Sequence, residues 1–242
     1  MHRETVLCLL LGMACFPVHA QEEEDAGGSL DRIEVVGSRI SYRDLLETPA
    51  VSLTKPGDYL LQSITLTNDS RDPALRKREL HDTIAQMIGA AGSRYRIYHE
   101  DEYRVQLARG SHQVEPENGK RPDSSQIALR IGVDIGANAA QAETIIGDMR
   151  KFLRGAVKVG RTEIELGGET ALVMNRPERF RYEIIDAIAK DSQKMIDAMA
   201  LDCKIELQGL NSRVEWQRAS AAELLLYIPY NMTISDCRRR MP

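Results

Sequence analysis

The chain has 242 residues, of which 43% are hydrophobic and 28% are charged, and its formal net charge at pH 7 is −4. This length suits one medium domain or two small ones, with enough apolar residues for a core. A mildly acidic chain lacks the clustered positive charge with which proteins bind nucleic acid, so the composition argues against a nucleic-acid partner.

The first residues have the features of a secretory signal. The stretch from Val6 to Val18 is apolar, and Val18-His19-Ala20 places small residues at positions −3 and −1 of a cut before Gln21. A membrane anchor is the competing interpretation, but a bilayer-spanning helix needs roughly 20 apolar residues. We therefore predict a signal peptide over 1–20, export to the periplasm, and no transmembrane segment in the mature chain.

The remainder divides by composition into three regions. Residues 21–50 are an acidic leader followed by a short strand-like run and a connector, residues 51–236 carry the periodic patterns of a folded domain, and residues 237–242 are a basic tail. Helices are expected where apolar residues recur every three or four positions: 73–91, with Asp72 as N-cap, then from about Asn138, and from Pro177 onward.

Strands are expected where apolar and polar residues alternate. The predicted strands are 59–67, 95–98 with 103–107, 127–135, 164–174 with a turn at Gly167-Gly168, 203–207, and one long strand from Leu224 to Ile234 that is at an edge or bulged at Pro229. Three amphipathic helices packed on mostly antiparallel strands give a two-layer α+β fold. The pattern does not decide between one sheet and several.

Cysteine counting predicts one disulfide. Cys8 and Cys15 leave with the signal, so that Cys203 and Cys237 remain in a chain destined for an oxidising compartment. The alternative is two separate thiols. A bond between them would stabilise the fold by about 3–4 kcal/mol in the chain-entropy model.

No pattern of catalytic or metal-binding residues is found. His81, His99 and His112 have no His or Cys partner at ligand spacing. The acidic run Glu100-Asp101-Glu102 is interpreted as a hydrated turn between two strands rather than as an acid–base pair. We therefore predict no metal, no cofactor and no enzymatic activity.

One charged run has two interpretations. Arg76, Lys77 and Arg78 lie in the early turns of the first predicted helix, where positive charge opposes the helix dipole. A bound anion or an acidic partner would compensate for this charge. The simpler interpretation is a solvated helix face.

Two resemblances to known families are visible. Asp31 to Ile40 (DRIEVVGSRI) resembles the start of the plug of TonB-dependent receptors, which marks Ile33, Val35 and Ile40 as a segment for strand addition to a partner. Ile33-Glu34-Val35-Val36-Gly37, the Lys55-Pro56-Gly57-Asp58-Tyr59 strand start and the long helix from Pro177 resemble the SIMPL-domain family of exported proteins. That resemblance implies a SIMPL-like two-layer α+β fold, a periplasmic location, self-assembly and no established catalytic residues.

Two functions follow as hypotheses. The first is a periplasmic, non-enzymatic protein of SIMPL-like fold that acts in envelope maintenance through self-association or protein binding, with a homo-oligomer or an envelope protein as partner. The second is an accessory module of a TonB-dependent outer-membrane uptake system, which would use residues 33–40 as an added strand.

Overall fold

The computed structural model describes residues 32–36, 48–100 and 104–239. Within these ranges the chain forms α-helices packed with antiparallel sheets, which confirms the predicted α+β class. The helices are α2 (Pro73–Ala91), α3 (Ala142–Arg154) and α4 (Arg181–Met199). Short 3-10 helices, η1 (Gly136–Gln141) and η2 (Pro177–Phe180), lead into α3 and α4.

A large antiparallel sheet forms the body of the molecule. Its order is β1-β8-β3-β7-β4-β5, and a short strand, β6, also pairs with β7. The strands are β1 (Arg32–Val35), β3 (Tyr59–Asn68), β4 (Arg96–Glu100), β5 (Arg104–Gln106), β6 (Glu117–Asn118), β7 (Ser125–Asp134) and β8 (Thr162–Asn175). Strand β3 is central, because it pairs with β7 on one side and with β8 on the other.

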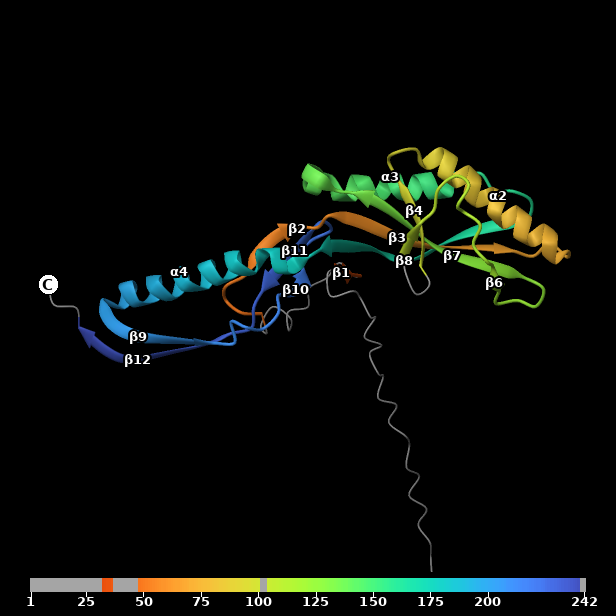
Figure 1. The fold of residues 1–242 in the computed structure, drawn as a ribbon. Helices are drawn as coiled ribbons and strands as arrows, with labels where there is room; N and C mark the ends of the chain where they lie inside the picture. The colour runs from red at the N-terminus through yellow and green to blue at the C-terminus, as the bar shows by residue number, and fades with distance from the viewer. Residues whose placement is uncertain (1–31, 37–47, 101–103, 240–242) are drawn as a thin grey trace, which may run out of the picture.

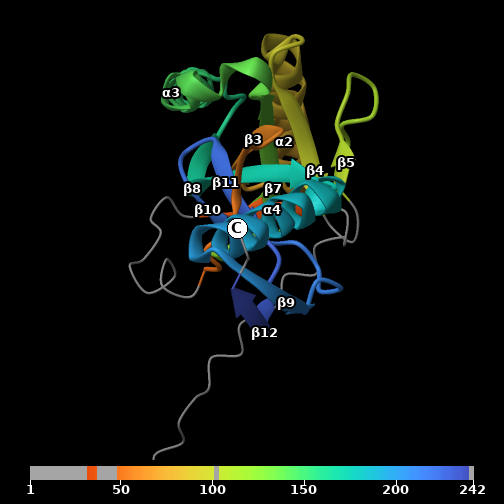
Figure 2. The same cartoon turned by 90° about the vertical axis from the view of Figure 1, so that its left-hand side faces the viewer.

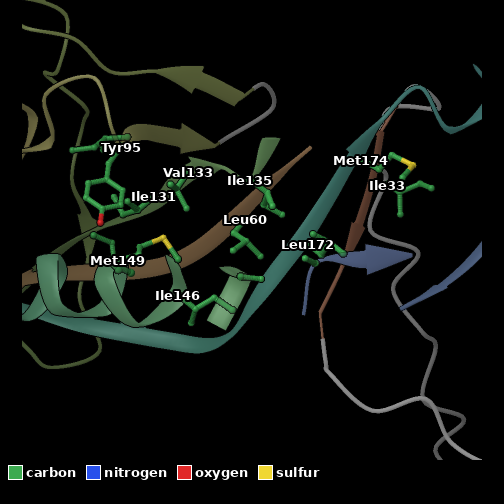
Figure 3. Close-up of a cluster of buried hydrophobic side chains, with 14 of the residues drawn as sticks. Ile33, Leu60, Tyr95, Ile131, Val133, Ile135, Ile146, Met149, Leu172 and Met174 are labelled. Carbon is green, nitrogen blue, oxygen red and sulfur yellow. The ribbon is translucent and has the colours of Figure 1, made fainter. Parts of the chain in front are cut away.

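Helices α2 and α3 cover one face of this sheet, and the core lies between the two layers (Figure 1). Figure 3 shows Leu60, Ile131 and Val133 from the strands meeting Ile146 and Met149 from α3. The period-two pattern of β7 explains this arrangement, since alternate side chains of a strand point to the same face.

The C-terminal part of the chain forms an arm that projects from the body (Figures 1 and 2). In the arm, α4 packs along β9 (Leu201–Gln208), which pairs with β12 (Asn231–Arg239) in a sheet of two described strands. A three-stranded sheet of β2 (Leu53–Pro56), β10 (Glu215–Arg218) and β11 (Glu223–Tyr227) lies where the arm joins the body.

The folded region begins before residue 51, the predicted start of the domain. Strand β1 pairs with β8 in the large sheet, with Ile33 opposite Met174, and Ile33 is buried in the core. Arg218 is also buried, and its guanidinium donates to the carbonyl oxygens of Val35 and Thr170. It therefore ties the small sheet to both strands. At the other end, the predicted basic tail from Cys237 overlaps β12.

The predicted turn at Gly167-Gly168 is wrong, because β8 runs through it as one strand. The pairing with β3 instead shifts register between Leu61 and Ser63, and Gly168 has a φ of 49°. The buried amide of Gln62 occupies this bulge: it donates to the Gly167 carbonyl oxygen at 2.6 Å and accepts from the Thr170 hydroxyl at 2.8 Å.

Two further boundaries differ from the prediction. Leu224 to Ile234 is not one strand, because β11 ends at Tyr227 and β12, in a different sheet, begins at Asn231. Pro229 lies in the connection, where its missing N–H removes no ladder bond. The two later helices begin four residues beyond the predicted starts, at Ala142 and Arg181, because each is preceded by 3-10 turns.

Candidate functional site

The face of the large sheet opposite α2 and α3 carries charged and aromatic side chains. Because strand residues alternate between faces, the residues that flank the core positions gather on this open face. They come from five strands: Arg32 and Glu34 of β1, Tyr59 of β3, Arg96, Tyr98 and Glu100 of β4, Arg104 of β5, and Arg130 and Asp134 of β7. Gly132 of β7 leaves room for Tyr98, whose ring would lie 2.9 Å from a Cβ at that position.

Arg104 is at the centre of this group, and its side chain is only 7% exposed. Its Nη2 lies 2.9 Å from Glu34 Oε2, its Nε lies 3.2 Å from Glu100 Oε1, and its Nη1 donates to the Tyr59 hydroxyl at 3.0 Å. Burial is the largest influence and lowers the pKa of Arg104, but the bonds to Glu100 and Glu34 together outweigh it and raise the pKa. The residue therefore carries a fixed positive charge.

The same two glutamates bind further arginines. Arg130 places its Nε 2.7 Å from Glu100 Oε2 and bonds Glu34 through Nη1, while Arg32 Nη2 lies 3.5 Å from Glu100 Oε1. Three guanidinium groups thus share two carboxylates. The network is held in place by strands that are far apart in sequence.

A hollow of about 410 Å³ opens on this face. On one wall Arg96 pairs with Asp134, and its guanidinium carbon lies 5.9 Å from the centre of the Tyr59 ring. On another, the guanidinium carbon of Arg104 lies 5.8 Å from the centre of the Tyr98 ring. Burial raises the pKa of Tyr98, so its phenol stays neutral. The Arg96 Nε is buried and has no hydrogen-bond partner among the described residues.

Metal-binding chemistry has no candidate in the described part of the chain, where no three His, Cys, Asp or Glu side chains gather in a way that could hold an ion. The ring nitrogens of His81 and His99 instead lie 2.7 Å and 3.2 Å from the carbonyl oxygens of Val114 and Ala128. Glu100, which the sequence placed in a hydrated turn, lies in β4 and bonds the arginines described above.

The three residues of the basic run do not converge on one site. Arg76 is buried: its Nη1 donates to the Ser70 carbonyl oxygen at 2.8 Å, and its Nε donates to the Ser125 hydroxyl at 3.2 Å. Arg76 therefore holds the turn before α2 against β7. Lys77 pairs with Glu115, and Arg78 is exposed on the helix surface.

Part of the segment that was predicted to add as a strand to a partner instead pairs with a strand of this chain. Ile33 and Val35 pair with Met174 and Leu172 of β8, so β1 adds to the protein's own sheet. Ile40 lies outside the described residues.

Cys203 and Cys237 form a disulfide, with 4.1 Å between their Cα atoms. The bond joins β9 to β12 near the end of the arm that is farthest from the body (Figure 1). Next to it, the β9–β12 pairing shifts register between Ser235 and Arg238, and Asp236 has a φ of 54°. The disulfide thus fixes the C-terminal strand at a point where its hydrogen-bond ladder is interrupted.

The arm also presents unpaired strand edges. Strands β9 and β12 pair only with each other among the described strands, so each has one outer edge with no strand beside it. On β9, half-buried Leu201, Cys203, Ile205 and Leu207 alternate with exposed Asp202, Lys204, Glu206 and Gln208.

Sequence reasoning missed the arginine–glutamate network. The available signal was the alternation of Arg104 and Gln106 with apolar neighbours, which predicts a polar strand face but not what meets it. Glu34 and Arg104 are 70 residues apart, and Glu34 and Arg130 are 96 apart. Only the strand order brings them together.

Comparisons with known proteins add no family to this description. The chain matches no family model, no curated protein and no solved structure. In the described residues no helix combines the length and apolar character needed to cross a membrane.

Proposed function

We propose that this protein is an exported, periplasmic, non-enzymatic protein that acts in envelope maintenance through self-association or protein binding, and that the arm is its contact element. The observation that supports the proposal is the arm itself. Its α4 covers one face of a two-stranded sheet whose outer edges have no partner strand among the described residues. Unpaired backbone N–H and C=O groups along a sheet edge are a template for another strand.

The disulfide is consistent with the proposed location. A bond between Cys203 and Cys237 persists in an oxidising compartment and is rare in the reducing cytosol. It holds the two strands of the arm together without adding apolar area, which leaves the edges available for pairing.

Of the two edges, β9 is better suited to pair with a second copy of this chain. The edge of β12 carries a bulge at Ser235–Arg238 and two consecutive arginines, Arg238 and Arg239, and such features discourage strand addition. Strand β9 has no proline, glycine or register shift over its eight residues.

The sequence of β9 is also complementary to itself. If two copies pair antiparallel with Ile205 opposite Ile205, then Lys204 faces Glu206 twice and Cys203 faces Leu207. Opposite charges meet on the exposed face, apolar groups meet on the face that α4 covers, and the two bodies lie at opposite ends. This register predicts a symmetric dimer with a four-stranded sheet across its centre.

Charge reversal tests the dimer. Light scattering after size-exclusion chromatography is expected to show a concentration-dependent dimer for the mature chain. Lys204→Glu or Glu206→Lys alone converts both cross-strand pairs to like charges and is expected to weaken the dimer about tenfold. The double variant, Lys204→Glu with Glu206→Lys, exchanges the charges and is expected to restore it.

The control is Lys194→Glu, which reverses an exposed charge on α4 without touching β9 and should leave the dimer unchanged. A dimer that is weakened by neither Lys204→Glu nor Glu206→Lys would contradict the β9 register but not self-association. A monomer at every concentration would contradict self-association and leave protein binding by the arm as the proposal. Protein binding is tested by comparing the envelope proteins captured by the wild-type chain and by a variant mutated in residues 201–208.

No observation favours the accessory role in TonB-dependent uptake. The described part of its candidate segment, Ile33 and Val35, is already paired with β8.

A further inference from the structure

We propose that the hollow on the open face of the large sheet binds an oxyanion, a carboxylate or a phosphate group, on the guanidinium groups of Arg96 and Arg32. This site lies on the body and uses none of the arm residues, so it is independent of the proposed function.

Among the described residues, the charges around the hollow do not balance. Arg32, Arg104 and Arg130 share the two carboxylates of Glu34 and Glu100. Arg96 pairs with Asp134, and Asp58, which also lines the hollow, pairs with Arg179. Among the described residues, one positive charge therefore has no carboxylate of its own. A single bound oxyanion would neutralise it.

Arg96 and Arg32 have N–H donors that the described residues do not fully use. The Arg96 Nε is buried without a hydrogen-bond partner in the described part of the chain, and a buried donor left unpaired is destabilising. The one contact that the structure shows for the Arg32 guanidinium is to Glu100 at 3.5 Å, the outer limit of a hydrogen bond. Both side chains line the hollow, so both guanidinium groups border the space that a ligand would occupy.

The site is built before any ligand arrives. The guanidinium of Arg96 lies over the Tyr59 ring and is anchored by Asp134, and Tyr59 is itself held by the bond from Arg104. A planar guanidinium fork that is already fixed loses little freedom on binding and matches the two oxygens of a carboxylate or phosphate. The hollow, at about 410 Å³, has room for a small acid or a peptide C-terminus.

The experiment is a titration of the mature chain followed by ¹H–¹⁵N NMR of backbone amides and of the arginine Nε–H groups. Three probes are used at constant ionic strength: N-acetylglycine as a carboxylate, inorganic phosphate, and N-acetylglycinamide as the neutral match of the first. We expect a saturable shift of the Arg96 Nε–H and of the β4 amides with one or both oxyanions, and none with the amide. The stronger probe identifies which oxyanion the site prefers.

Arg96→Lys keeps the positive charge but removes the guanidinium fork, and it is expected to weaken binding at least tenfold. Arg32→Lys breaks only one long contact within the protein and is expected to weaken binding at least threefold. The matched control is Arg94→Lys, two residues earlier, whose exposed side chain pairs with Asp148 of α3 and should leave affinity within twofold. The proposal is overturned if neither oxyanion moves these signals, if the neutral amide moves them equally, or if Arg94→Lys weakens binding as much as Arg96→Lys and Arg32→Lys.

Discussion

Helices α2 and α4 each have 19 residues, yet they are stabilised in different ways. Helix α2 packs on the large sheet and buries a broad set of side chains, with Leu80, Ile84 and Met87 fully buried. Helix α4 buries Ile184, Ile188, Ser192 and Ile196 in a single line: Ile184 and Ile188 join the core cluster of the body, and the helix packs along β9 of the arm. Equal helix length therefore gives unequal burial, because the partner surface decides how much of a helix is removed from water.

The strands show the same contrast. Six of the ten residues of β3 are buried, whereas no residue of β9 or β12 is fully buried. The line of buried α4 side chains includes Ser192, which donates to the Ile188 carbonyl oxygen, and Ile196 is the one apolar residue buried beyond it. We infer that the far end of the arm opens more readily than the body, since regions with little buried apolar area open first.

The largest effect is expected from a cavity in the body. Leu60→Ala removes a fully buried side chain from β3 and should lower the free energy of unfolding by about 2–5 kcal/mol. Leu207→Ala removes a half-buried side chain from β9 and should cost only about 1–2 kcal/mol. Urea unfolding followed by circular dichroism measures both. Equal losses would contradict the inferred difference between body and arm.

Removing the disulfide should act on the arm alone. Cys203→Ser with Cys237→Ser opens a loop with a sequence separation of 34 residues, and the chain-entropy model gives a loss of about 3–4 kcal/mol. Hydrogen exchange is expected to accelerate in the second half of α4 and in β9 and β12. The amides of β3 and β7 are the internal control, and faster exchange there would show that the arm and body unfold together.

Replacing a charged residue should also destabilise the protein more in the body than in the arm. Arg104→Met in the body leaves Glu34 and Glu100 with one donor fewer each and removes the partner of the Tyr59 hydroxyl, so we expect a loss of about 2–3 kcal/mol. Lys190→Ala breaks an exposed ion pair with Asp186 on α4 and should have no measurable effect. Thermal unfolding of the two variants compares them directly.

The smallest expected effect is the loss of the stabilising contribution of Glu79 as the pH falls. Hydrogen bonds from Asn68 and Ser70 lower the pKa of Glu79 in the body. Because its pKa is lower when folded, Glu79 stabilises the protein above the unfolded value of about 4.3, and that contribution is lost as the pH falls through the folded value. Glu79→Gln should therefore cost up to about 1 kcal/mol near neutral pH and progressively less between about pH 5 and 2.

Stability measured by urea unfolding across that pH range tests the sign. The matched control is Glu115→Gln, which breaks an exposed ion pair with Lys77 and should change the stability at neutral pH by less than about 0.5 kcal/mol. A difference in the free energy of unfolding between wild type and Glu79→Gln that grows as the pH falls would contradict the lowered pKa of Glu79.

Local features of the sequence predicted much of the fold. Asp72 caps α2, as expected from the Asp72-Pro73 pair, with its carboxylate accepting from the Ala74 N–H at 2.8 Å. The hairpin of β4 and β5 and the alternation of β7 also follow from nearest-neighbour patterns. The polar Gln62 among the apolar residues Leu60, Ile64 and Leu66 on one face of β3 was the signal for the bulge in β8, but its partner residues could not be read from the chain.

The sequence by itself determined the α+β class, the main helices and strands, and the cysteine pair, because caps, periodicity and counting depend on residues close together or few in number. The tertiary structure alone decided that α4 packs on a separate two-stranded arm, that β1 completes the large sheet, and that four arginines meet three carboxylates on its open face. These features depend on strand order, which pairs residues 68 to 96 positions apart. No local pattern specifies which strands pair, since one apolar strand face can pack against many others.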